Sequence, residues 1–190
     1  MLARVLSSAV IGIQAYVVTV EVDISSGLPS FSTVGLPEGA LRESKDRVRT
    51  SIRNSGYPFP SDRITVNLAP ADVRKEGAAF DLPIAVGILA ATGLVPQEAL
   101  TEHLLVGELS LDGGLRPVAG MLPIAVAARE AGLKGLFVPV ENGSEAAVVE
   151  GLSIYAVRHL SEVVDNLCGK TQVEPLAADL QSLFSSREGP

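Results

Sequence analysis

Four basic side chains recur along one segment of the sequence at a spacing that could hold phosphate groups. Arg42, Lys45, Arg49 and Arg53 are three or four residues apart, which places them on one side of an α-helix. Guanidinium and ammonium groups in such a row bind the phosphates of nucleic acids without any need for aromatic residues. We therefore treat this stripe as a candidate DNA-binding surface, which Arg74 and Lys75 could extend.

The charge around the stripe differs from that of the whole chain. The net charge is −7, yet residues 42–75 hold eight basic and four acidic side chains and are net positive. Local charge decides what a binding face attracts. The stripe is also compatible with a solvated helix face moderated by Glu43 and Asp46, or with an interface to an acidic neighbouring subunit.

The other residues that could carry chemistry lack the partners that the chemistry needs. Gly169-Lys170-Thr171 looks like the end of a phosphate loop, but Val164 stands where such a loop requires its first glycine. His103 and His159 have no histidine or cysteine at ligand spacing. Asp81 is expected to cap the helix that follows it. We therefore predict no catalytic, cofactor-binding or metal-binding residue in this chain.

The composition is typical of one cytoplasmic α/β domain. The chain has 190 residues, of which 47% are hydrophobic, enough to bury a sizeable core. Only 4% are aromatic and none is Trp, which argues against base-stacking platforms for single-stranded nucleic acid. Cys168 has no partner for a disulfide, which favours a reducing compartment. No apolar run approaches the roughly 20 residues that cross a bilayer, so we expect no membrane association.

The hydrophobic pattern predicts the elements that must position the stripe. Alternating Val and Ile residues predict an antiparallel pair of strands joined near Gly12. The stripe itself lies on a helix that Ser55-Gly56 ends. In the first half we predict strands over 3–11, 15–24, 31–34 and 63–67, and a helix over 40–54.

The second half repeats strand–helix units. Asn142 and Glu145 are expected to form a capping box, and Ser161 is expected to cap the last helix. We predict helices over 82–94, 121–132, 142–149 and 161–167, and strands over 104–108, 115–118, 133–139 and 154–157. The chain is therefore predicted to be α/β (α+β), with a mixed sheet and helices packed on it.

Two glycine-containing segments, Lys75–Asp81 and Gly107–Gly120, each run into an apolar helix. Together they resemble the proteolytic domain of Lon-type Ser-Lys peptidases, within the ribosomal-protein-S5-domain-2-like fold. By alignment with that family, the nucleophile position is Ala79 and the position of its lysine base is Leu122. A methyl group cannot attack a carbonyl and an isobutyl group cannot take a proton. The resemblance thus implies a peptidase scaffold without its catalytic pair, and we expect no enzyme activity of this chain itself.

Three further runs carry a closer resemblance. Val34–Arg49, Asn54–Tyr57 and Asn67–Asp72 resemble the N-terminal domain of the magnesium-chelatase-like AAA+ ATPases of the ComM (YifB) family, and the similarity covers residues 3–168. It implies a Lon-like N-terminal domain over 1–168 and a linker over 169–190 towards an AAA+ module that this sequence does not contain.

The same resemblance implies a function for the full-length protein. Members of the family are expected to be hexameric, ATP-driven helicases for DNA branch migration in natural transformation and recombination, with ATP and Mg²⁺ bound in the AAA+ module. This domain would add DNA contact, subunit packing or both, with its own AAA+ module, neighbouring subunits and forked or branched DNA as partners. The alternative is a protein-interaction or regulatory domain of a magnesium-chelatase-like ATPase with no DNA contact.

Overall fold

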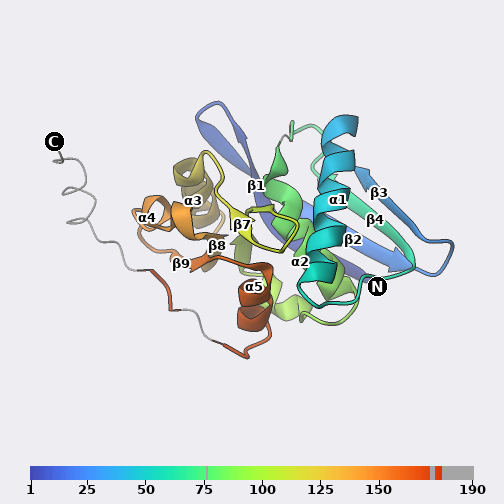
Figure 1. Cartoon of the computed structure of the whole chain (residues 1–190). Coiled ribbons are helices and arrows are strands. Elements are labelled where there is room, and N and C mark those ends of the chain that lie inside the picture. Colours follow the sequence, from blue (N-terminus) through green and yellow to red (C-terminus); the bar gives the residue numbers. More distant parts are fainter. Residues whose placement is uncertain (76, 172–173, 177–190) are drawn as a thin grey trace.

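A seven-stranded mixed sheet organises the computed structural model, which describes residues 1–75, 77–171 and 174–176 (Figure 1). The strand order is β3-β4-β2-β1-β5-β8-β9. Strands β1, β2 and β4 are antiparallel neighbours, whereas β3 runs parallel to β4, and β1, β5, β8 and β9 run parallel to one another. The strands are β1 (Leu2–Ile11), β2 (Gln14–Ser25), β3 (Ser30–Val34), β4 (Arg63–Ala69), β5 (His103–Leu105), β8 (Gly135–Pro139) and β9 (Ser153–Val157). The predicted mixed α/β sheet is thus confirmed.

The β1–β2 hairpin follows directly from the alternating sequence. Val18, Val20 and Val22 are fully buried on one face of β2, and Val20 pairs with Val5 of β1. Because successive side chains of a strand point to opposite faces, this spacing fixes the register of the hairpin. Gly12 has φ of 63°, the left-handed conformation that the tight turn requires.

Helices cover both faces of the sheet. On one face, α2 lies against β1 and β2 and α1 lies outside α2. Every residue of α2 is buried, and its sequence accordingly shows no polar side apart from Asp81. The helices are α1 (Glu38–Asn54), α2 (Asp81–Ala91), α3 (Met121–Glu130), α4 (Gly143–Ala146) and α5 (Leu160–Leu167), with 3-10 turns η1 (Ala78–Phe80), η2 (Gln97–Leu100) and η3 (Val140–Asn142). All described helices are too short or too polar to cross a bilayer.

Adjacent residues of the parallel strands separate the core into two clusters. Leu105 and Phe137 pack with the α1, α2 and α5 side, whereas Leu104 and Leu136 pack with α3 and α4. The alternation of side chains therefore places the two helical layers on opposite faces of the sheet. Figure 1 shows α1 and α2 near the β3–β4 end of the sheet, and α4 and α5 near β9.

The predicted strand over 104–108 is confirmed only at its start, in β5, because the chain leaves the sheet after Leu105. Gly107 instead accepts a hydrogen bond from the amide of Leu82 and donates one to the carbonyl of Ala79, both at 3.0 Å. These bonds pin the segment over the start of α2. It then forms a separate two-stranded ribbon with β6 (Glu108–Leu109) and β7 (Leu115–Arg116). The predicted helix over 82–94 also ends early, at Ala91.

Two predicted helix caps are also wrong. Asn142 makes no cap bond to α4; its side chain instead bonds both backbone groups of Val118 at 2.9 Å. Glu145 accepts a bond from the amide of Leu122 rather than closing a capping box. At α5 the cap is His159, whose ring nitrogen accepts the amide of Ser161 at 3.0 Å. At α4 the Asn142 side chain thus bonds a loop distant in sequence, whereas at α5 the Ser161 hydroxyl bonds the ring of the capping His159 at 2.8 Å.

The predicted linker over 169–190 lies mostly outside the described residues. In the described part of it, Gly169 follows α5, and Leu176 donates its amide to the carbonyl of Ile154 at 2.7 Å. This bridge places residues 174–176 beside β9. The division of the chain at residue 168 remains a prediction.

Gly87 marks the closest approach of α2 to the sheet. A Cβ atom there would lie 2.6 Å from a methyl carbon of Val22 and 3.4 Å from one of Val5. We expect Gly87→Ala to lower the free energy of unfolding by about 1–3 kcal/mol, because the added methyl overpacks this contact. The loss should exceed the helix-propensity gain of about 1 kcal/mol. Urea denaturation of the purified chain measures the difference.

Gly39→Ala is the matched control, because Gly39 lies in α1 with nothing within 4 Å of its added Cβ. That substitution should raise stability by up to about 1 kcal/mol. Removing the clashing methyls with Val22→Ala should make Gly87→Ala less harmful than it is alone. Equal effects of Gly87→Ala in both backgrounds would contradict the packing argument.

Candidate nucleic-acid interface

The predicted stripe lies on the outer side of α1. Val48 and Ile52 are buried on the inner side of the helix, which packs against α2. Arg53 is exposed, and Lys45 and Arg49 are half-buried. The amphipathic pattern of the helix therefore directs the basic residues away from the core.

Two phenylalanine rings gather the basic side chains into one group. Phe31 of β3 and Phe59, from the loop after α1, are stacked with centroids 6.0 Å apart and planes at 21°. The guanidinium of Arg49 lies 6.0 Å from the first ring and 5.6 Å from the second. Arg53 lies 5.5 Å from the Phe59 ring, and the Lys45 ammonium lies 5.9 Å from the Phe31 ring. We call these five residues the aromatic–cationic cluster.

The cluster borders a surface cleft of about 260 Å³. Within the described part of the chain, neither Arg49 nor Arg53 pairs with a carboxylate. Their charge is therefore available to an anion, held in place by the faces of the rings. One acidic residue, Asp62, also lines the cleft.

The remaining predicted residues lie outside the cluster. Arg42 is exposed on the first half of α1, and Arg74 is exposed on the loop after β4. Lys75 is only 3% exposed, and its ammonium donates to the carbonyls of Pro70 and Val73, the latter at 2.8 Å. In this structure Lys75 therefore holds its own loop and does not extend the exposed stripe. The structure brings together Lys45, Arg49 and Arg53 of the six predicted residues.

Sequence reasoning did not find the two phenylalanines. The aromatic content of the chain is low, and Phe31 and Phe59 lie on opposite sides of α1 in the sequence. Only the pairing of β3 with β4 and the turn after α1 bring their rings together. A usable signal was proline near each ring, with Pro29 two residues before Phe31 and Pro58 and Pro60 on either side of Phe59. Such prolines stiffen loops that present side chains.

A buried ion pair beneath the stripe was also missed. The carboxylate of Asp81 is fully buried and accepts from Nε of Arg47 at 2.6 Å and from its Nη2 at 3.2 Å. It also accepts from the Ser44 hydroxyl at 2.8 Å and from the Leu109 amide at 3.1 Å. Asp81 was expected to cap α2, but it makes no cap bond. Its four hydrogen bonds join α1, α2 and β6 instead.

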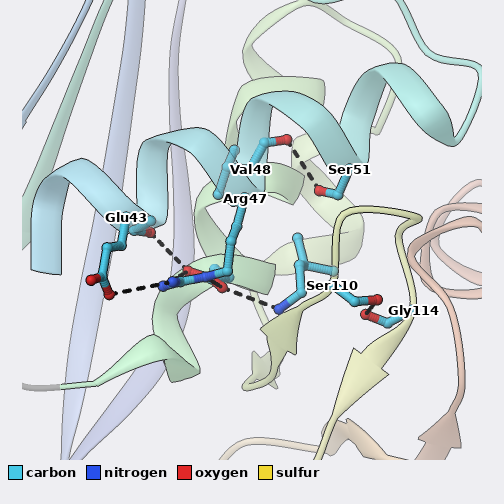
Figure 2. A network of polar contacts seen from close by, with 9 residues as sticks. Glu43, Arg47, Val48, Ser51, Ser110 and Gly114 are labelled. Carbon is cyan, nitrogen blue, oxygen red and sulfur yellow. Dashed lines mark hydrogen bonds and ion pairs between the residues drawn. The ribbon is translucent and has the colours of Figure 1, made fainter.

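The surroundings of this ion pair shift the pKa values of both Asp81 and Arg47. Burial raises the pKa of the Asp81 carboxyl above its ordinary value, and the hydrogen bonds from Arg47 and Ser44 oppose that rise. The hydrogen bond to Asp81 raises the pKa of the Arg47 guanidinium. Figure 2 shows Arg47 reaching from α1 with its guanidinium on the side of Glu43. The Glu43 carboxylate lies 3.8 Å from Arg47 and is largely exposed, so it adds little.

A second cleft includes Ala79, the position that the resemblance to Lon-type peptidases predicts for a nucleophile. Ala79 lines it together with Ser8, Glu108 and Ile124. Leu122, which aligns with the lysine base, lines a different groove with Ile13. The Ser8 hydroxyl donates to the carbonyl of Tyr16 at 3.0 Å. The described lining of the cleft thus holds a hydroxyl already engaged with the backbone, and no lysine or histidine beside it.

Comparisons with known proteins agree with the motifs in the sequence. The family ChlI, described as subunit ChlI of Mg-chelatase, matches residues 20–142. The uncharacterized protein YifB of Salmonella typhimurium is 46% identical over 182 residues, which cover 95% of this chain and 36% of that relative. Competence protein ComM of Haemophilus influenzae is 44% identical over 179 residues, which cover 94% of this chain and 35% of that relative. The chain thus spans only part of the length of these relatives.

A more distant similarity connects the chain with peptidases. Lon protease 2 of Bacillus subtilis is 28% identical over 150 residues, which cover 75% of this chain and 26% of that protein. This similarity agrees with the resemblance of the two turn segments to the Lon proteolytic domain.

The Arg47–Asp81 pair makes a testable prediction about stability. We expect Arg47→Met to lower the free energy of unfolding by about 3–5 kcal/mol, because it leaves a buried carboxylate without its cation. Without the opposing bonds from Arg47, the pKa of Asp81 rises further, so the folded state binds a proton more tightly than the unfolded state. The loss should therefore be smaller at acidic pH than at neutral pH. Urea denaturation across a pH series measures both effects.

Arg116→Met is the matched control, because Arg116 is exposed on β7. It should change stability by no more than about 0.5 kcal/mol. The double variant Arg47→Met/Asp81→Leu should recover much of the loss, since no unpaired charge remains. Additive losses in the double variant would contradict the role assigned to the ion pair.

Proposed function

Because the chain belongs to the family of the Mg-chelatase subunit ChlI, we propose that it is the non-catalytic N-terminal domain of a ComM-like AAA+ ATPase and contacts DNA. In this proposal the full-length protein is a cytoplasmic, hexameric helicase for branch migration in natural transformation and recombination. A separate AAA+ module would bind ATP and Mg²⁺. The domain described above would hold DNA against the ring and would also pack against neighbouring subunits.

One observation carries the proposal of DNA contact. Arg49 and Arg53 lie side by side at the same cleft, and neither has a carboxylate partner in the described part of the chain. Unpaired guanidinium groups bind phosphate oxygens in pairs and in a fixed geometry. The chain is acidic overall, so a positive surface on it is a local feature that attracts polyanions to one face.

A different surface supports the second candidate, a protein-interaction or regulatory domain without DNA contact. A groove of about 650 Å³ lies between the β1–β2 hairpin and α3. At its border Ile13 is 92% exposed, and Tyr16 and Leu122 are exposed as well. Exposed apolar side chains in a group mark surfaces that bind proteins. This groove suits subunit packing under the first candidate and a protein partner under the second.

The two candidates predict different responses to DNA. We expect the chain to bind a labelled forked DNA with an affinity that falls as salt rises, because phosphate contacts release counterions. Arg49→Ala/Arg53→Ala should weaken binding about tenfold or more and reduce the slope of log K against log salt by about 2. Fluorescence anisotropy over a salt series measures both quantities.

Arg129→Ala/Arg158→Ala is the charge-matched control, because both of its arginines are exposed on other elements. It should leave the affinity and the salt slope close to those of the unmodified chain. Failure of the chain to bind at low salt would refute the DNA contact and favour the protein-interaction domain. Equal losses in both double variants would refute the placement of the contact at Arg49 and Arg53.

A further inference from the structure

We propose that the aromatic–cationic cluster binds single-stranded DNA in preference to duplex DNA, with bases stacked on Phe31 and Phe59 and phosphates held by the basic side chains of α1. This inference rests on the proposed DNA contact and names the form of DNA that the contact takes. The low aromatic content of the sequence argued against such a platform. The structure concentrates two of the five phenylalanines of the chain at one cleft.

The position of the rings is the reason to expect a preference for single-stranded DNA over duplex DNA. Phe31 and Phe59 are both half-buried and line the cleft beside Arg49 and Arg53. The faces of duplex bases are stacked inside the double helix, so an aromatic ring at a protein surface cannot reach them. In a single strand these faces are free and stack on Phe, Tyr and Trp rings. Rings in a groove with cations are the combination that single-strand binding uses.

The basic residues of the cluster form a row along α1, beside the two rings. Lys45, Arg49 and Arg53 recur every four residues of α1, which corresponds to about 6 Å per step along the helix axis. Arg49 is central, since its guanidinium lies within 6.0 Å of both ring centroids. A strand that lies along α1 can thus place successive phosphates near the cations while its bases turn towards the rings. The planar guanidinium groups also offer stacking surfaces of their own.

Asp62 adds a negative charge to the lining of the cleft. Its carboxylate repels phosphate, and it lines the same cleft as Phe59. A phosphate is therefore expected nearer to Arg49 and Arg53, which line the same cleft, than to Asp62.

A tryptophan reporter tests the stacking directly. The chain contains no Trp, so Phe59→Trp places the only indole at the cleft. We expect oligo-dT to quench the fluorescence of this variant, because a stacked base lies against the indole, and a duplex of equal length to leave it nearly unchanged. Tyr16→Trp is the matched reporter, since Tyr16 is exposed at the groove beside α3. Its fluorescence should not respond to either DNA.

The double variant Phe31→Leu/Phe59→Leu tests how much the two rings contribute to DNA affinity. It keeps apolar side chains at both positions. We expect the affinity for oligo-dT to fall at least about fivefold, as for the loss of one stacked base. The weaker binding of duplex through the cations should remain within about twofold, and thermal unfolding should show that the variant is folded.

The outcomes separate this inference from the function on which it rests. If the arginine double variant weakens binding, while the phenylalanine variant binds oligo-dT as the unmodified chain does and the fluorescence of Phe59→Trp is not quenched, the single-strand inference is wrong and the DNA contact stands. Equal affinity for duplex and oligo-dT at the same salt also overturns the inference. Absence of binding to either DNA overturns both. Selective quenching together with the loss in the phenylalanine variant supports both.

Discussion

The buried carboxylate of Asp81 is the interaction on which the placement of α1 depends. It holds Arg47 and Ser44 of that helix and the Leu109 amide of β6 at one point. Since no solvent competes for a fully buried carboxylate, each of these donors is held in a fixed direction. The inner side of α1 is thereby fixed against α2. The outer side, with Arg49 and Arg53, takes its position relative to β3 from the same contact.

The turn before α2 is held by backbone groups. Gly107 ties the turn at Ala79 to the start of α2 through two backbone hydrogen bonds. That geometry depends on the backbone and does not require a particular side chain at Ala79. The candidate interface lies elsewhere, on side chains of α1, β3 and the loop after α1. The distant similarity to Lon proteases therefore informs the fold more than the site.

The sequence specifies local features well and distant contacts poorly. The alternation around Val20 predicted the hairpin, and the periodicity of α1 predicted its basic side, because both patterns act over a few residues. The pairing of Phe31 with Phe59 depends on tertiary structure, and no local pattern encodes it. Lys75 was predicted as a surface cation for the same reason, since its burial comes from the fold of its own loop around it. The sequence alone does not indicate whether a charged side chain will be surrounded by backbone carbonyls in the folded protein.

The uneven charge of the chain bears on how a proposed DNA contact would be restricted to one face. Outside residues 42–75 the chain is strongly acidic, and acidic surfaces repel the phosphate backbone. Repulsion of this kind weakens with salt together with the attraction at the cluster, so charge alone gives a contact that disappears as salt rises. The rings of Phe31 and Phe59 are uncharged, and stacking on them does not depend on counterion release. A site that combines both interactions would still bind unpaired bases at a salt concentration at which a purely cationic patch no longer binds DNA.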